Sequence, residues 1–332
     1  MEIHADVTKT YSDFLGYLEA EGARGTCFEE WTTGVLGDPE VQEWLGTLPE
    51  PKRQPNLVFA AARWHGVPAP GPYAGLRDAL LGDDGAIRET ILSRSTQTNE
   101  VGRLATLTPA FAQVAGDEPV ALIEVGASAG LCLYPDRWSY AWHTTAGTVR
   151  AGEGPTLECR VDGAFPTEIT APAVAWRGGV DLNPGDVDDS DQMAWLTNLV
   201  FPEEEDRRER LGTAIGIART DPPHLVKGDL LDELPRLVDE ASEHGRVVVF
   251  HSAVIAYLEE ADRRRYFDLV SGLVADGRCH WVSNEGKRVL PEVTATGPEI
   301  PEERQTFVLG VDGQAVAWTH GHGRTMTWLG PA

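Results

Sequence analysis

The stretch 120-VALIEVGASAG-130 decides the fold class of this chain. Its first six residues form an apolar run with a single carboxylate, Glu124, as expected for a strand buried on both faces of a parallel sheet. The small residues from Gly126 to Gly130 then predict a turn from this strand into a helix. Such a turn lets a ligand approach the backbone and offers it the unpaired N–H groups of a helix start.

Strand-like runs alternate with helical ones downstream of this stretch. We expect strands at 173–182, 224–229, 246–252 and 279–284, and helices at about 189–219, 230–244 and 259–275. The runs 305–311 and 314–320 are separated by Asp312-Gly313, which is typical of a hairpin, and 324–329 follows. Between Trp142 and Pro172, the stretch 148–163 predicts an inserted β-hairpin. The fold class is therefore α/β, with a Rossmann-like, mostly parallel sheet that closes with an antiparallel hairpin.

Residues 1–115 show helical spacing and almost no strand signal. Apolar side chains recur every three or four residues, and Pro/Gly breaks such as 66–75 separate the helices. A polar run, 93-SRSTQTNEVGR-103, precedes a last helix over 104–114. We therefore expect an α-helical cap domain at 1–115 and a sheet domain at 116–332, with an insertion at about 143–172.

Composition excludes several classes of function. The 332 residues include 28 Lys and Arg against 52 Asp and Glu, and a net charge of −24 repels phosphate backbones, so we expect no nucleic-acid partner. The chain has neither an apolar run of membrane-spanning length nor a signal-peptide pattern, which favours a cytoplasmic protein without membrane contact. The four cysteines lie far apart, and His320 and His322 stand two apart in a turn, so we expect no metal site. The oligomeric state is not indicated.

Three kinds of site use a small-residue turn such as 126–130. A dinucleotide site requires G-x-G-x-x-G, but Ser128 and Leu131 occupy the second and third glycine positions. A hydrolase nucleophile elbow requires G-x-S-x-G, which this turn matches, with Ser128 as the nucleophile. However, such an elbow normally follows several strands, whereas this turn follows the first strand, and no H-G-G-G stretch supplies an oxyanion hole.

The third kind of site explains more of the chain. The segment 124–130, E-x-G-x-S-x-G, resembles the glycine loop of class I S-adenosylmethionine-dependent methyltransferases. The resemblance covers about residues 120–330, because acidic residues follow in 179-GVDLNP-184 and 226-VKGDLLDELP-235, and 249-VFHSAVIAYL-258 looks like the loop beneath the transferring methyl group. It implies a Rossmann-like methyltransferase sheet, with S-adenosylmethionine as cofactor and S-adenosylhomocysteine as product.

The whole chain also resembles an uncharacterised family of bacterial and archaeal proteins with a methyltransferase-like core. The stretches QTNEVGR (97–103) and WRGGVDLNP (176–184) are part of this resemblance. The resemblance names no substrate.

The methyltransferase resemblance also assigns roles to individual residues. It implies that Glu124, Gly126, Ser128 and Gly130 hold the methionine and sugar parts of the cofactor, that Asp181 and Asp229 hold ribose and adenine, and that Asn99 closes over it. Asp181 lies 51 residues after Gly130, further than the roughly 20 residues usual for a ribose-binding acid, so Glu153 or Glu158 could hold the ribose instead. If the acceptor must lose a proton, His251 or Glu100 is the candidate base.

The expected function is therefore an S-adenosylmethionine-dependent methyltransferase that acts on an unidentified small-molecule acceptor. The cofactor supplies most of the reactivity, so the protein mainly binds and aligns the reactants. Two alternatives are a non-catalytic adenosyl- or nucleoside-binding protein of the same fold and a serine hydrolase using Ser128. We also expect residues 1–115 to cover the carboxyl ends of the first and fourth strands, with Asn99 or Glu100 facing the cofactor cleft.

Overall fold

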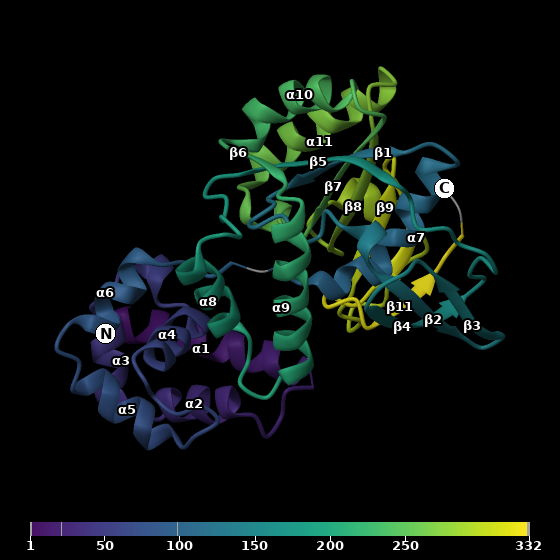
Figure 1. Cartoon of the computed structure of the whole chain (residues 1–332). Coiled ribbons are helices and arrows are strands. Elements are labelled where there is room, and N and C mark those ends of the chain that lie inside the picture. The colour runs from purple at the N-terminus through teal and green to yellow at the C-terminus, as the bar shows by residue number, and fades with distance from the viewer. Residues whose placement is uncertain (1, 21, 98, 331–332) are drawn as a thin grey trace. The chain divides into compact units, whose positions relative to one another are not determined.

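The computed structural model describes residues 2–20, 22–97 and 99–330. It contains two compact units: Met1–Thr98 with Ser190–Gly212, and Asn99–Asp189 with Thr213–Ala332 (Figure 1). Each unit has a hydrophobic cluster of its own. The helix α7 (Leu104–Ala115) belongs to the unit of the sheet, whereas its sequence pattern grouped it with the preceding helices.

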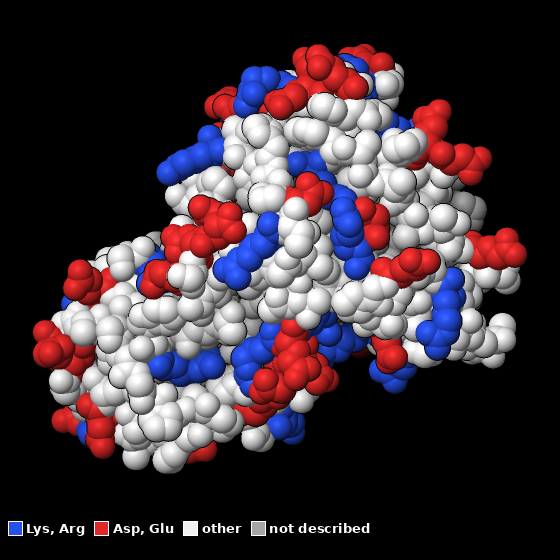
Figure 2. Space-filling model, viewed as in Figure 1, with Lys and Arg blue, Asp and Glu red and all other residues white. Residues whose placement is uncertain are grey.

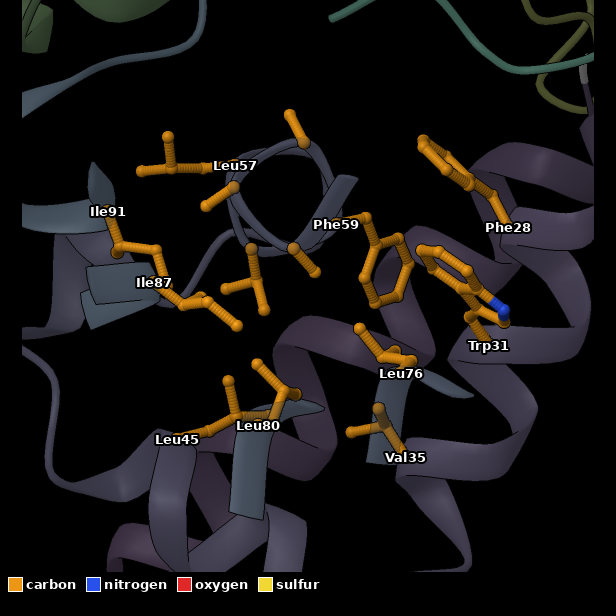
Figure 3. Packing of buried hydrophobic residues seen from close by; sticks show 14 of the residues in the cluster. Phe28, Trp31, Val35, Leu45, Leu57, Phe59, Leu76, Leu80, Ile87 and Ile91 are labelled. Atoms are coloured by element: carbon orange, nitrogen blue, oxygen red, sulfur yellow. The ribbon is translucent and has the colours of Figure 1, made fainter. Parts of the chain in front are cut away.

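The first unit is helical. Its helices are α1 (Glu2–Ala20), α2 (Cys27–Leu36), α3 (Pro39–Gly46), η1 (Glu50–Lys52), α4 (Pro55–Trp64), α5 (Tyr73–Leu81), α6 (Ala86–Ser93) and α8 (Ser190–Leu199). Side chains cap two of them, because Thr26 accepts a hydrogen bond from the first turn of α2 and Asp38 from that of α3. Figure 3 shows the core, where the Phe59 ring meets Phe28 at a centroid distance of 5.1 Å and Trp31 at 5.4 Å. Within the described ranges, no helix is long and apolar enough to cross a bilayer.

The second unit is built on one mixed sheet. Its strands are β1 (Val120–Val125), β2 (Ser139–Thr144), β3 (Gly147–Ala151), β4 (Thr156–Gly163), β5 (Val174–Asp181), β6 (His224–Lys227), β7 (Arg246–Ser252), β8 (His280–Gly286), β9 (Phe307–Val311), β10 (Gln314–Thr319) and β11 (Thr325–Trp328). In the described part of the chain, these eleven strands lie in the order β3-β2-β4-β11-β10-β9-β8-β7-β1-β5-β6. The α/β class expected from the sequence is confirmed.

Five neighbouring strands of this sheet, β8, β7, β1, β5 and β6, pair in parallel with one another. β1 pairs in parallel with both β5 and β7, so the strand order reverses on either side of β1. The helices α10 (Leu230–Ala241) and α11 (Glu260–Ala275) pack with Val247 and Val249 on one face. α7 covers the other face, where Phe111 meets Phe250 at a centroid distance of 5.0 Å. Open parallel sheets bind ligands at the carboxyl end of such a reversal.

The described residues contain five further helical elements. They are η2 (Val101–Arg103), η3 (Pro135–Arg137), α9 (Glu205–Thr220), η4 (Ile255–Tyr257) and α12 (Pro291–Thr294). The hairpin expected at Asp312-Gly313 is confirmed: β9 and β10 are antiparallel, and both turn residues have positive φ, 47° and 84°.

The material between Trp142 and Pro172 pairs differently from the expected hairpin. β3 and β4 do not pair with each other; β2 lies between them, antiparallel to β3 and parallel to β4. The chain crosses over one end of β2, where a Cβ at Gly152 would lie 2.2 Å from the carbonyl oxygen of Trp138. β4 then pairs with β11, so this segment extends the main sheet instead of forming a separate hairpin.

Candidate functional site

The turn after β1 does not open a helix, so that expectation was wrong. Turns follow Val125, and the next regular element is η3. Gly126, Ser128 and Gly130 have φ values of 68°, 50° and 69°. An α-helix requires negative φ at consecutive residues, so left-handed residues at every second position prevent one from forming.

The N–H groups of this turn are bound by the protein itself. All five described residues from 126 to 130 donate to oxygens of this chain: Gly126 and Ala127 to Val180 O (2.8 and 3.2 Å), Ser128 to Asp181 Oδ2 (2.8 Å), Ala129 to Asn99 Oδ1 (3.3 Å) and Gly130 to Ala127 O (2.7 Å). Alternating backbone conformations of this kind form a concave nest of N–H groups. These five N–H groups are therefore not free to bind a ligand phosphate.

Three of the predicted cofactor residues come together at this turn. Asn99 Nδ2 donates to Ser128 Oγ at 2.8 Å, and Asp181 accepts from the Ser128 N–H. Asp181 ends β5, directly beside β1, whereas Glu158 lies in β4, with five strands between β4 and β1. Of the acids considered for the ribose, Asp181 is therefore the one that contacts the glycine turn.

Glu124 lies at the carboxyl end of β1 and is 8% exposed. Its Oε2 atom is buried without a hydrogen-bond partner. Burial raises the pKa of this carboxyl well above its ordinary value, and the Asp181 charge raises it further, whereas the Arg103 charge lowers it. The site thus contains a desolvated carboxyl group, one oxygen of which, Oε2, lacks a donor.

Gly126 lies in close contact with the loop after β7. A Cβ at this position would lie 2.5 Å from Cγ1 of Val254. Any larger residue would therefore displace this loop, in addition to opposing the positive φ.

The segment from Asn99 to Arg103 lies along the carboxyl edge of the sheet. Asn99 contacts the turn after β1, and the Arg103 guanidinium donates to Ser252 O at the end of β7 (2.9 Å) and to Gly321 O after β10 (2.7 Å). Asn99 and Glu100 therefore both lie at this edge of the sheet. Thr98, in the same stretch, lies outside the described residues.

Glu100 joins this segment to the turn between β10 and β11. Its Oε1 accepts from the Gly102 N–H at 3.0 Å, and its Oε2 lies 3.0 Å from His322 Nδ1. Glu100 is 3% exposed, so the pair is largely shielded from water. A buried carboxylate bound to an imidazole is an arrangement that orients a histidine for proton transfer.

Sequence reasoning assigned no role to Arg103 or His322. The motif HGHGR (320–324) was considered for metal binding alone, and the second motif, NEVGR (99–103), lies more than 200 residues away. Both motifs end in Gly-Arg, and this similarity was the available signal. Over the described part of the chain, no group of three or more His, Cys, Asp or Glu side chains could hold a metal ion.

His251 occupies a different environment from the one expected of a base. It is fully buried in β7, with Nδ1 2.8 Å from Glu285 Oε1 and Nε2 accepting from the indole N–H of Trp281 at 3.1 Å. The same Glu285 oxygen accepts from the N–H groups of Val254 and Ile255 at 2.9 and 3.0 Å. Both imidazole nitrogens are engaged, so His251 positions the loop after β7 in this structure.

Asp229 is exposed at the end of β6. Its Oδ1 accepts from the Leu231 N–H at 2.8 Å and caps α10. The neighbouring Gly228 N–H donates to Asp181 O at 3.0 Å, which keeps the ends of β5 and β6 together. The structure brings Asp229 to the same edge as Asp181 but shows no contact between it and the glycine turn within the described residues.

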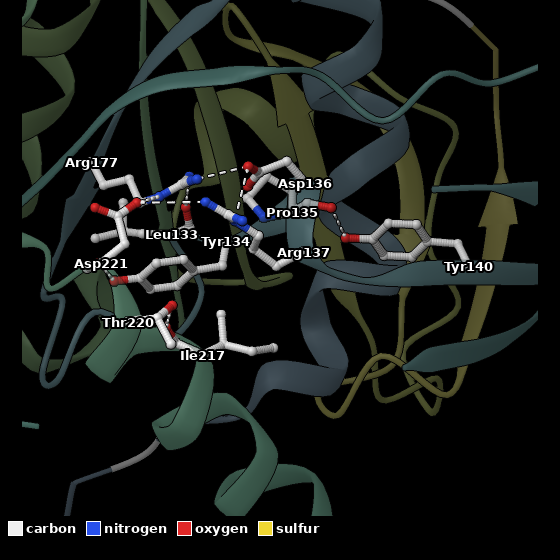
Figure 4. Close-up of polar contacts among 10 residues, drawn as sticks. All are labelled: Leu133, Tyr134, Pro135, Asp136, Arg137, Tyr140, Arg177, Ile217, Thr220 and Asp221. Atoms are coloured by element: carbon white, nitrogen blue, oxygen red, sulfur yellow. Dashed lines mark hydrogen bonds and ion pairs between the residues drawn. The ribbon is translucent and has the colours of Figure 1, made fainter. Parts of the chain in front are cut away.

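Arg177 fixes the chain that follows the glycine turn (Figure 4). Arg177 is buried, and its guanidinium donates to Asp136 at 2.7 Å, to Leu133 O at 2.9 Å and to Asp221 at 3.3 Å. It also lies 4.7 Å from the ring of Tyr134, whose hydroxyl donates to Asp221 O. Arg177 of β5 therefore fixes the chain segment that follows the turn.

A family model matches most of the chain. The model of a family described as "Uncharacterized protein conserved in bacteria (DUF2332)" matches residues 17–328. No curated protein and no solved structure matches the chain.

Proposed function

Because the chain belongs to the bacterial family DUF2332, whose description states no activity, we propose a function from its site: an S-adenosylmethionine-dependent methyltransferase that acts on a small-molecule acceptor. The observation that carries the proposal is the buried carboxyl of Glu124, whose Oε2 atom has no hydrogen-bond partner. It lies at the carboxyl end of β1, where the strand order reverses and open α/β sheets bind ligands.

The chemistry of Glu124 favours a cationic ligand. Burying a carboxylate without a donor is costly, and a positive group or hydrogen-bond donor from a ligand removes that cost. S-adenosylmethionine carries a sulfonium and an ammonium group, whereas a dinucleotide carries phosphates. The charge of Asp181 repels phosphates, and the N–H groups of the turn are already engaged.

The strand ends provide the rest of the proposed cofactor site. The turn of Gly126, Ser128 and Gly130 lies beside the end of β5, so Asp181 is placed to accept from ribose hydroxyls with its remaining lone pairs. Asp229, at the end of β6, is the proposed adenine contact. Asn99 lies over the turn and positions Ser128. In this proposal, the sheet is a Rossmann-like methyltransferase sheet.

The residues at the carboxyl edge have a limited chemical task. When bound, S-adenosylmethionine supplies the methyl group, and its sulfur keeps the electron pair of the broken C–S bond. The protein aligns the acceptor lone pair with that bond and removes the acceptor proton where one must leave. We assign proton removal to the Glu100–His322 pair, because both nitrogens of His251 are bound within the fold.

Isothermal titration with S-adenosylhomocysteine, S-adenosylmethionine and NAD tests this proposal. We expect both adenosyl ligands to bind and NAD to bind at least about tenfold more weakly, a difference of about 1.4 kcal/mol. Glu124→Gln should weaken adenosyl binding about tenfold or more, because it removes the charge that pairs with the ligand cation. Glu153→Gln, an exposed carboxyl between β3 and β4, is the matched control. Tighter binding of NAD than of S-adenosylhomocysteine contradicts the proposal.

The hydrolase alternative has one feature in its favour. Ser128 adopts the left-handed backbone of a strained turn, as the nucleophile of an elbow does. However, its Oγ accepts from the amide of Asn99, and an amide N–H cannot take a proton from the serine. A nucleophilic serine needs a base at that position, so we do not propose this activity.

A further inference from the structure

A polar groove with a volume of about 550 Å³ lies where β4, β10 and β11 meet the segment 304–306. Two arginines line it, Arg160 and Arg304, together with the partly buried ring of Trp318 and several threonine hydroxyls. Its volume is within the range of small-molecule sites. We propose that this groove binds a small organic anion, a carboxylate or a phosphate ester, through its two guanidinium groups.

Arg304 is held in place before any ligand binds. Its guanidinium lies 4.5 Å from the centroid of the Trp318 ring and donates to Thr327 Oγ1 at 2.9 Å. Its backbone is held as well, because Lys287 Nζ donates to the carbonyls of Pro301 (2.9 Å), Glu302 and Arg304 (both 2.7 Å). A fixed guanidinium loses little conformational entropy when it binds an anion.

The two groove arginines differ from many others in this acidic protein. On the face shown in Figure 2, Lys and Arg side chains lie beside Asp and Glu side chains. Ion pairs such as Arg177–Asp136, at 2.7 Å, occur elsewhere in the chain. Within the described residues, neither Arg160 nor Arg304 pairs with a carboxylate. The groove lining contains one acid, Asp162, against these two arginines. In a chain of net charge −24, this is a local excess of positive charge in a concave surface.

The groups around the arginines suit an oxyanion. A guanidinium binds carboxylates and phosphates through paired N–H groups, and its donors remain charged at every physiological pH. Thr325 and Thr327, on β11, add hydroxyl groups to the same lining. Carboxylates and phosphates are both bound by guanidinium groups in this way. The proposal therefore names an oxyanion, and the experiment below distinguishes a carboxylate from a phosphate ester.

The groove adjoins the edge where we place methyl transfer. His320 belongs to its lining, and the His320 ring lies 5.7 Å from that of His322, which contacts Glu100. If the proposed methyltransferase function holds, on which this step rests, the anion in the groove is the methyl acceptor or a part of it. Anion binding itself does not depend on that function.

Titration of the full chain with three aromatic probes tests the proposal: phenyl phosphate, benzoate and phenol, in chloride buffer of low ionic strength. We expect at least one anion to bind about tenfold more tightly than phenol. Arg304→Gln should remove most of that preference. Arg150→Gln, which makes the same change at an exposed position of β3 outside the groove, should change affinity less than about twofold. Thermal melts of both variants confirm that they are folded.

Each outcome of this experiment decides the proposal. Binding of phenyl phosphate alone assigns a phosphate ester, and binding of benzoate alone assigns a carboxylate. Anions that bind no more tightly than phenol, or that bind Arg304→Gln and Arg150→Gln equally, overturn it. S-adenosylhomocysteine is titrated in parallel. Anion binding without adenosyl binding supports the groove proposal and contradicts the methyltransferase proposal. Adenosyl binding without anion binding contradicts the groove proposal alone.

Discussion

Glu124, the proposed contact for the cofactor's positive charge, should lower the stability of the free protein. Its Oε2 atom is buried without a partner, and burial raises the pKa of the carboxyl well above the ordinary value of 4.5. The folded protein therefore holds this proton more tightly than the unfolded chain does. Between the unfolded and folded pKa values, the free energy of unfolding falls as pH rises, because folding then requires either proton uptake or burial of a charge.

Glu124→Gln should consequently stabilise the free protein at neutral and alkaline pH. The substitution keeps the shape but removes the buried charge, and we expect a gain of about 1–3 kcal/mol. Thermal unfolding from pH 4 to 9 provides the measurement, and the gain should vanish as the pH falls toward 4, where both side chains are neutral. Melting curves of wild type and variant that remain parallel across this range would exclude the buried charge as the cause. Glu153→Gln, which makes the same change at an exposed position, serves as the control.

At the scale of elements, two substitutions in the turn at 126–130 should have unequal effects on adenosyl binding. Gly126→Val places a branched side chain against Val254 and opposes a φ of 68°, so it should abolish adenosyl binding. Ser128→Ala removes one hydrogen bond, the one from Asn99, at a cost of about 1 kcal/mol. Its adenosyl affinity should stay within about tenfold of wild type, measured by titration calorimetry.

The same pair of variants addresses the hydrolase reading. If Ser128 were a nucleophile, a fluorophosphonate probe would label the parent protein at Ser128, and Ser128→Ala would lose both labelling and ester turnover. We expect no labelling. Stoichiometric modification of Ser128 in the parent protein is the result that contradicts our assignment.

At the scale of elements, local signals were sufficient where neighbours in sequence are neighbours in space. The apolar run of β1 and the Asp312-Gly313 pair of the β9–β10 hairpin were readable in this way. The conformation of the glycine turn was not, because Ser128 shares the left-handed backbone of the two glycines without being one. The partners of β3 and β4 were also hidden, since each pairs with β2 and β4 also with β11, far along the chain.

At the scale of the whole molecule, the candidate site depends on contacts between distant segments. Glu124, Ser128 and Asp181 were predictable from strand ends and the glycine spacing. Glu100 was predictable as a candidate base, but its partner His322 was not. His322 lies 222 residues away along the chain, and only the strand order of the sheet brings the two residues into contact. His251 looked reactive in the sequence, but Glu285 and Trp281 on β8, which engage both its nitrogens, could not be paired with it before the sheet was known.

The net charge of −24 leads to a prediction for the molecule as a whole. With 52 acidic and 28 basic side chains, like-charge repulsion opposes the compact state. Salt screens this repulsion, and it also screens attractive pairs, but exposed pairs such as Lys9–Asp13 contribute little to stability because both partners lie in water. Repulsion among the excess carboxylates therefore determines the sign, and added salt should stabilise the fold.

Calorimetric melting at pH 7.5 in about 0.01 to 0.15 M NaCl measures this effect, because the Debye length falls from about 30 to 8 Å over that range. We expect Tm to rise steadily with salt and most of the rise to occur below about 0.1 M, where screening changes fastest. Repeating the series near pH 4.5, where many carboxyls are protonated, should flatten the dependence. A Tm that falls with salt at pH 7.5 would instead show that attractive ion pairs outweigh the repulsion of the excess acids.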